Sequence, residues 1–113
     1  SLYLDEDGGW RVIAPTDPGP QPFGVGGEMV LWASRDRGAS WTRERAVTRD
    51  SRFNHTYARR PLDAHPDFQA IWADGDTRAP SDSRLYFSNR DGTGVRRLPA
   101  SMDGDFAEPE NVR

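Results

Sequence analysis

Glycine and proline punctuate this chain so densely that they limit what it can fold into. The sequence of 113 residues contains eleven glycines and nine prolines, and residues 15–27 alone hold four of each. Proline removes a backbone donor and glycine weakens regular structure, so this segment is expected to be a loop rather than a helix or a central strand. The same density of breakers excludes long helices and favours short strands joined by turns.

Short apolar runs on either side of polar, glycine-containing turns predict three β-hairpins. The hairpins span residues 1–14, 28–48 and 84–98, with a further strand at residues 68–73 and a short edge segment near Phe23. Residues 29–32 are almost continuously apolar, as in a strand that is buried on both faces. Residues 50–67 are predicted to be irregular. The expected fold is therefore all-β and antiparallel.

Aromatic content decides between two interpretations of the low apolar fraction, which is 35%. Disordered chains are poor in aromatic residues, whereas this chain has four tryptophans, five phenylalanines and three tyrosines, so a folded domain is expected. The chain has no cysteine, which excludes disulfides and thiolate metal sites. No apolar run approaches the roughly 18 residues of a membrane span, so no membrane partner is predicted.

The charge of the chain is mild overall but unevenly placed. A net charge of −3 does not indicate nucleic-acid binding. All fifteen basic residues are arginine, and eight of them lie between Arg35 and Arg60. Arginine binds carboxylate, phosphate or sulfate through two parallel hydrogen bonds, so this cluster fits an anionic partner. A general use of arginine on the surface is the alternative. Residues 100–113 form an acidic C-terminal tail.

The turn of the central predicted hairpin carries the most specific motif, Ser34-Arg35-Asp36-Arg37-Gly38-Ala39-Ser40-Trp41. An aspartate in such a turn accepts N–H bonds from the residues that follow it, and Gly38 supplies a position with positive φ. Trp41 is expected to leave the turn and pack between neighbouring sheets. These contacts predict that Ser34, Asp36, Gly38 and Trp41 stabilise the turn.

Two relaxed copies of this motif flank the central one. The first hairpin holds one copy, with Asp5, Gly9 and Trp10. The third hairpin holds the other, with Ser88, Gly92 and Val95, but Arg90 occupies the place of the aspartate there. A motif that recurs at successive hairpin turns indicates a repeat architecture.

The central motif resembles the Asp box of BNR-repeat, sialidase-like β-propellers, with Ser40 in place of the usual threonine. Asp boxes lie at peripheral turns of the blades, far from the active centre, so the resemblance implies that the motif residues are structural rather than catalytic. Beyond the Asp box, the resemblance is carried by residues 26–32, 54–61, 64–68, 72–75 and 83–87, within a region that covers residues 26–99. It implies that residues 1–99 form a partial β-propeller of about two to three blades, because complete propellers of this kind have about six or seven four-stranded blades. The remaining blades are expected from a longer parent chain or from self-association. The resemblance also implies a secreted or periplasmic protein.

Related propellers include sialidases, other glycoside hydrolases and polysaccharide lyases that act on uronate-containing glycans. A lyase needs a group that neutralises the uronate carboxylate, a base and an acid, and arginine, histidine and tyrosine suit these roles. Both histidines of the chain lie in residues 54–67, and the predicted catalytic residues are His55, Tyr57 and Arg59. The predicted substrate-binding residues are Arg60, His65, Trp72 and Asp74.

Other roles for these residues stay open. The histidines can hold loops in place by hydrogen-bonding backbone carbonyls, and the arginines can form ion pairs with Asp63, Asp67 or Asp74. Hydrolases use two carboxylates, for which Asp67 and Asp74 are available. No third ligand accompanies the two histidines, so neither a metal nor a cofactor is predicted. Residues 58–61, Ala-Arg-Arg-Pro, only weakly resemble the Arg-Ile-Pro motif of sialidases, whose arginine triad is not found here.

These observations predict a fragment of a carbohydrate-active propeller enzyme, either a polysaccharide lyase or a glycoside hydrolase, that acts on anionic glycans. The alternative is a non-catalytic glycan-binding or scaffold propeller, in which Trp72 stacks on sugar rings. A protein-interaction module built from the same blades is a third hypothesis. The predicted partner is a carbohydrate, such as a uronate-containing glycan.

Overall fold

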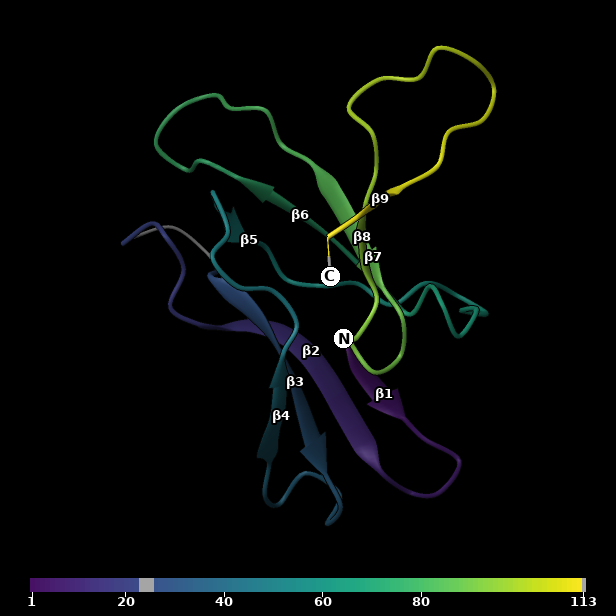
Figure 1. Cartoon of the computed structure of the whole chain (residues 1–113). Helices are drawn as coiled ribbons and strands as arrows, with labels where there is room; N and C mark the ends of the chain where they lie inside the picture. The colour runs from purple at the N-terminus through teal and green to yellow at the C-terminus, as the bar shows by residue number, and fades with distance from the viewer. Residues whose placement is uncertain (23–25, 113) are drawn as a thin grey trace.

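The chain forms two antiparallel β-sheets, and the described residues contain no helix (Figure 1). The structure is a computed structural model that describes residues 1–22 and 26–112, so the edge segment expected near Phe23 lies outside the described residues. Neither sheet is closed within this part of the chain. The prediction of an all-β fold is confirmed. The strands are β1 (Leu2–Leu4), β2 (Trp10–Asp17), β3 (Glu28–Ser34), β4 (Thr42–Ala46), β5 (Asn54–His55), β6 (Ala70–Gly75), β7 (Leu85–Ser88), β8 (Val95–Arg97) and β9 (Glu110–Asn111).

The first sheet is a four-stranded meander in the order β1-β2-β3-β4. Its centre is the β2–β3 pair, in which Ile13 lies opposite Leu31 and both side chains are buried. β2 continues to Asp17, beyond the start of the loop that the prolines predict. The strand tolerates Pro15 because β1 pairs only with residues 10–12, so β2 has no neighbour on that side at Pro15.

The second sheet is a meander in the order β5-β6-β7-β8-β9. Two of its strands are absent from the sequence-based expectation. β5 lies in the segment predicted to be irregular, and β9 lies in the acidic tail, where Glu110 pairs with Arg97 and Asn111 with Arg96. Both strands have only two residues, which is too short for an alternating pattern to identify.

Backbone hydrogen bonds between Gly27 and His55 join the two sheets. The His55 amide donates to the Gly27 carbonyl over 2.9 Å, and the Gly27 amide donates to the His55 carbonyl over 3.3 Å. The preceding Gly26 has φ 103°, and a Cβ at this position would lie 1.7 Å from the carbonyl oxygen of His55. Glycine is therefore required at position 26 both by its backbone conformation and by this close approach.

The hydrophobic core contains buried side chains from both sheets and their connections. β1, β2 and β3 contribute from the first sheet, and β6, β7 and β8 from the second. The core residues are Tyr3, Ile13, Met29, Leu31, Val47, Ala58, Ala70, Trp72, Tyr86 and Val95. Because both sheets bury side chains in one cluster, they form one packed unit.

The turn that carries the Asp-box-like motif, residues 34–41, joins β3 to β4 and forms the local hydrogen bonds that its residue types predict. Asp36 Oδ1 accepts from the Ser40 amide and the Ser34 hydroxyl, each over 2.8 Å, and Gly38 has φ 86°. Trp41 differs from the expectation. Its side chain is 38% exposed instead of packed between sheets, and the strand that follows it, β4, lies at the edge of the first sheet.

The turns of the first and third hairpins contact each other through Asp5 and Arg90. Arg90 Nη2 lies 2.8 Å from Asp5 Oδ1, and Arg11 binds the same carboxylate over 2.9 Å. Arg11 Nη1 also donates to the carbonyl oxygen of Arg90 over 2.6 Å. The residue that replaces the motif aspartate in the third hairpin thus binds the aspartate of the first, and this ties the two sheets together away from the Gly27–His55 bridge.

Candidate functional site

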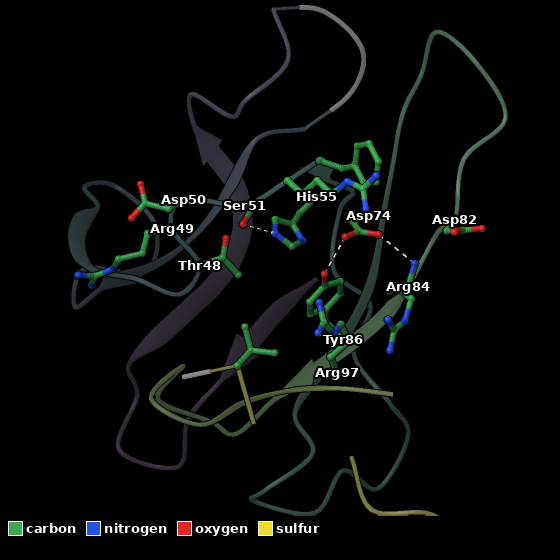
Figure 2. A pocket seen from close by; sticks show the side chains of 13 residues that line it. Thr48, Arg49, Asp50, Ser51, His55, Asp74, Asp82, Arg84, Tyr86 and Arg97 are labelled. Carbon is green, nitrogen blue, oxygen red and sulfur yellow. Dashed lines mark hydrogen bonds between the residues drawn. The ribbon is translucent and has the colours of Figure 1, made fainter. Parts of the chain in front are cut away.

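A cavity of about 580 Å³ lies where the segment between β4 and β5 meets β6, β7 and β8 (Figure 2). Its wall combines arginines, aspartates and aromatic residues from five parts of the chain. The lining residues are Thr48, Arg49, Asp50, Ser51, Arg52, Phe53, His55, Asp74, Asp82, Arg84, Tyr86, Arg97 and Val112. The volume falls in the range of small-molecule sites, which makes this cavity the candidate functional site.

Asp74 and Tyr86 form a hydrogen-bonded pair in the cavity wall. The Tyr86 hydroxyl donates to Asp74 Oδ2 over 2.7 Å, and the backbone amide of Arg84 donates to Asp74 Oδ1 over 2.9 Å. Figure 2 shows the Asp74 carboxylate held between these two donors. Burial raises the pKa of Tyr86, and its hydrogen bond to Asp74 raises this pKa further. Tyr86 therefore keeps its proton at neutral pH and acts as a donor.

Four arginines and three aspartates line the cavity, which leaves an excess of positive charge. Asp74 already accepts two hydrogen bonds from within the wall, so it is the most fully engaged of the three carboxylates. Arg52 lies over the ring of Phe53, with its guanidinium carbon 4.9 Å from the ring centre. A guanidinium that stacks on an aromatic face keeps its N–H groups available for an anion in the same plane.

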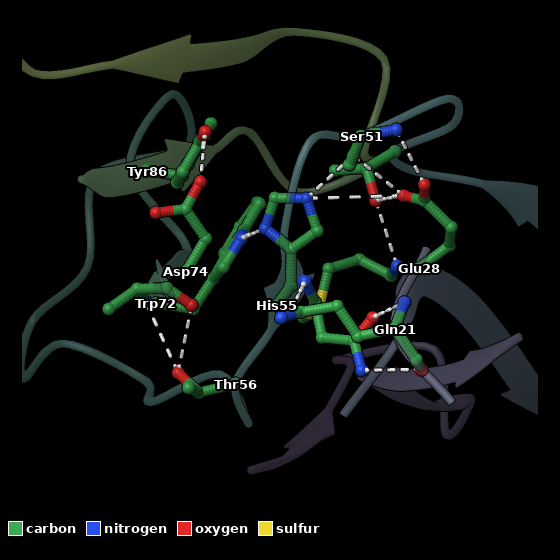
Figure 3. A network of polar contacts seen from close by, with 12 residues as sticks. Gln21, Glu28, Ser51, His55, Thr56, Trp72, Asp74 and Tyr86 are labelled. Carbon is green, nitrogen blue, oxygen red and sulfur yellow. Dashed lines mark hydrogen bonds and ion pairs between the residues drawn. The ribbon is translucent and has the colours of Figure 1, made fainter. Parts of the chain in front are cut away.

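His55 lies within a buried hydrogen-bond network that extends from Trp72 to the first sheet (Figure 3). The Trp72 indole donates to His55 Nδ1 over 3.0 Å, and His55 Nε2 lies 2.8 Å from the Ser51 hydroxyl. The Ser51 hydroxyl in turn donates to Glu28 over 2.8 Å. Because an indole nitrogen only donates, Nδ1 is the acceptor and the proton of neutral His55 sits on Nε2.

The protonation state of His55 follows from its surroundings. Burial lowers the pKa of His55, and the nearby carboxylates of Glu28 and Asp74 oppose this shift only in part. The ring is therefore neutral at pH 7, and its single lone pair is already bound by Trp72. Glu28 also accepts hydrogen bonds from the Ser51 amide over 2.8 Å and from the Thr48 hydroxyl, so both oxygens of its carboxylate have hydrogen-bond partners.

Among the residues predicted to act on substrate, only His55 and Asp74 line the cavity. Tyr57 and Arg59 lie together elsewhere on the surface, where Arg59 Nη2 donates to the Tyr57 hydroxyl over 2.7 Å. Arg60 lies over the ring of Tyr3 in a separate cavity of about 470 Å³. The structure therefore divides the predicted catalytic set between two places.

His65 and Trp72 have opposite environments. The His65 side chain is 73% exposed and lies 3.8 Å from Asp67. Trp72 is only 2% exposed, and its ring stacks against Tyr86 with the ring centres 5.9 Å apart. The Trp72 ring thus has no face open to a sugar in this structure, and its contacts are those of a core residue.

Most of the residues that surround the cavity carry no signal in the sequence that predicts a site. Tyr86 stands between Leu85 and Phe87 in an apolar strand, and such a pattern indicates a strand but not a site. Strand register supplies the missing signal, because Trp72 pairs with Tyr86 across β6 and β7. That pairing places Asp74 within reach of both Tyr86 and Arg84.

The part of the chain that the structure describes contains no group of three histidine, cysteine, aspartate or glutamate side chains positioned to hold a metal ion. Within the same residues, no helix is long and apolar enough to cross a membrane. Comparisons of the chain with family models, with curated proteins and with solved structures find no match.

Proposed function

We propose that this chain is part of a carbohydrate-active, sialidase-like β-propeller and that its cavity binds the anionic groups of a glycan, such as uronate carboxylates. The observation that carries this proposal is the convergence of Arg49, Arg52, Arg84 and Arg97 on one cavity. Arginine forks match the geometry of carboxylate and sulfate groups, and the Tyr86 hydroxyl and the Phe53 ring add the polar and apolar contacts that a sugar needs.

The sheet topology supports a partial propeller of two blades. Each sheet contains a four-stranded antiparallel meander, which is the unit from which propellers are built. The Asp box joins the third and fourth strands of the first sheet, and the relaxed motif with Arg90 joins the third and fourth strands of the second. The remaining blades are expected from a longer parent chain or from further copies of this one.

Non-catalytic binding is favoured by the environment of His55, one of the residues predicted to act as base or acid. A catalytic base needs a lone pair that can reach a substrate proton, and the Nδ1 lone pair of His55 accepts from the buried Trp72 indole. Catalysis as a lyase is the second candidate, and it is favoured by Tyr86. Its hydroxyl lines the cavity as the donor that protonates the leaving sugar oxygen, and the neighbouring Asp74 carboxylate, which also lines the cavity, is the acceptor for the proton removed from the sugar carbon, so the two proton transfers of the elimination balance.

Calorimetric titration with a galacturonate tetrasaccharide tests the binding proposal, with the methyl-esterified tetrasaccharide as an uncharged control ligand. We expect Arg52→Gln and Arg97→Gln to weaken binding about three- to tenfold each, because each removes a charge-assisted contact. Arg96→Gln is the matched control, since Arg96 neighbours Arg97 on β8 but does not line the cavity. Equal binding of the ester, or equal effects of all three variants, would reject the proposal.

The lyase candidate has a separate test. Elimination produces an unsaturated uronate, whose absorbance in the ultraviolet can be followed during incubation with the same tetrasaccharide. We expect Tyr86→Phe to abolish this signal, because the variant lacks the proton donor, while the arginines still bind the tetrasaccharide with reduced affinity. A signal that Tyr86→Phe leaves unchanged would remove Tyr86 from the chemistry.

A further inference from the structure

The carboxylate of Glu110 is bound to two arginines of the cavity. Glu110 Oε2 lies 2.7 Å from Arg97 Nε and 2.6 Å from Arg97 Nη2. Glu110 Oε1 lies 3.5 Å from Arg84 Nη2. The carboxylate of this C-terminal strand therefore occupies the arginine donors that an anion in the cavity would need.

Glu110 and a backbone carbonyl engage part of the donor set of Arg97 and Arg84. Two nitrogens of Arg97 face Glu110, and Arg84 Nη2 also donates to the carbonyl oxygen of Leu98 over 2.7 Å. The hydrogen bond from Arg97, followed by the charges of Arg97 and Arg84, lowers the pKa of Glu110, so its carboxylate is ionised at neutral pH. While Glu110 is in place, two nitrogens of Arg97 and Nη2 of Arg84 are therefore engaged, whereas Nε of Arg84 is buried without a hydrogen-bond partner among the described residues.

β9, which carries Glu110, is held by few contacts. It has two residues, both exposed, and it pairs only with β8 at the edge of the sheet. One further backbone bond follows it, from the Val112 amide to the Val95 carbonyl over 2.9 Å. Residues 98–109, which precede β9, form no strand. A short edge strand with so few buried contacts opens at low free-energy cost.

We propose that Glu110 is an internal ligand of the cavity and that an external anion competes with it for Arg97 and Arg84. This inference rests on the proposed function, since it concerns the same site. When Glu110 is bound, the cavity has reduced affinity for an anionic glycan. When β9 separates from β8, the guanidinium groups of Arg97 and Arg84 are released together and the cavity reaches its full affinity.

The test compares Glu110→Gln with the unchanged chain in titrations with the galacturonate tetrasaccharide. The substitution keeps the shape of the side chain and removes its charge, so we expect binding about two- to fivefold tighter. Glu108→Gln is the matched control, because it removes the same charge two residues away and is expected to leave affinity unchanged. Hydrogen exchange gives a second measurement: binding to the unchanged chain should speed exchange at the Val112 amide.

The possible results separate this inference from the proposed function. Tighter binding by Glu110→Gln alone, with faster exchange at Val112 on binding, supports both. Equal or weaker binding by Glu110→Gln, while Arg97→Gln still loses affinity, overturns the internal ligand and leaves the glycan site standing. Absence of binding by the unchanged chain and by Glu110→Gln overturns both.

Discussion

The indole nitrogen of Trp72 donates a 3.0 Å hydrogen bond to Nδ1 of His55. This contact fixes the tautomer of the histidine, places its remaining proton toward Ser51 and uses its only lone pair. The ring also lies edge-on to Tyr86, with the ring centres 4.9 Å apart. Through Ser51 and Glu28 the same network reaches β3, so His55 connects the interior of both sheets.

Replacement of His55 by alanine should destabilise the fold. The change leaves a cavity, and it leaves the Trp72 N–H buried without an acceptor. We expect the free energy of unfolding to fall by about 2–4 kcal/mol, measured by urea denaturation. His65→Ala, which removes the exposed histidine, should change it by less than about 0.5 kcal/mol. Similar losses in the two variants would show that the buried network does not stabilise the fold.

The pKa of His55 predicts how stability depends on pH. Burial lowers this pKa in the folded state, so below about pH 6.5 the unfolded chain binds a proton that the folded chain does not. Stability from this group is complete above about pH 6.5 and declines as the pH falls toward the folded pKa, by up to about 1.4 kcal/mol per pH unit.

Urea denaturation of the unchanged chain and of His55→Gln, across the range from about pH 7.5 to pH 5, measures this contribution. Glutamine does not titrate, so the difference between the two curves isolates His55. The unchanged chain should lose more stability than the variant as the pH falls. Parallel curves would indicate that His55 titrates alike in the folded and unfolded chains.

The turn between β3 and β4 should hold an unusually acidic carboxyl group, that of Asp36. Hydrogen bonds from the Ser40 hydroxyl and amide, then from the Ser34 hydroxyl, lower the pKa of Asp36 to about 2. Carbon NMR of the labelled carboxyl group measures this value, and Ser40→Ala should raise it by removing the first of these donors. Ser101→Ala, in an exposed segment, should leave it unchanged. The turn's contribution to stability is present at neutral pH and is lost as the pH falls through about 2.

Gly26 should tolerate no side chain. A Cβ at this position would meet the carbonyl oxygen of His55 at 1.7 Å, and its φ of 103° disfavours any other residue. We expect Gly26→Ala to lower the free energy of unfolding by at least about 2 kcal/mol. Gly104→Ala meets no neighbour within 4 Å and should have little effect. If both variants unfold alike, the two sheets are not joined as closely at Gly26 as the structure indicates.

Much of the fold was predictable because its signals are local. The apolar run of residues 29–32, the alternation around Tyr86 and the turn chemistry of Asp36 and Gly38 each act within a few neighbouring residues. The two short strands were not predictable, because β5 and β9 form only where a longer strand offers an unpaired edge. The place of Pro15 in β2 was not predictable either, because it depends on which strands pair with β2. No described strand pairs with β2 on the β1 side at this position, so the missing N–H of Pro15 interrupts no pairing there.

The site was less predictable than the fold because it depends on distant pairings. His55 and Asp74 were identified by residue type and do line the cavity, but the type of His55 did not reveal that its lone pair is bound by Trp72. Tyr57 and Arg59 are close to His55 in the sequence and still lie outside the cavity. Arg84, Arg97 and Tyr86 converge only through the register of β6, β7 and β8.

The contact between Asp5 and Arg90 bears on how the two sheets pack against each other. The two turns carry opposite charges where they meet, since Arg90 Nη2 lies 2.8 Å from Asp5 Oδ1. Two carboxylates at the same distance would repel each other. The arginine at position 90 therefore makes the third hairpin turn electrostatically complementary to the first, and the sign of one side chain favours this arrangement of the two sheets.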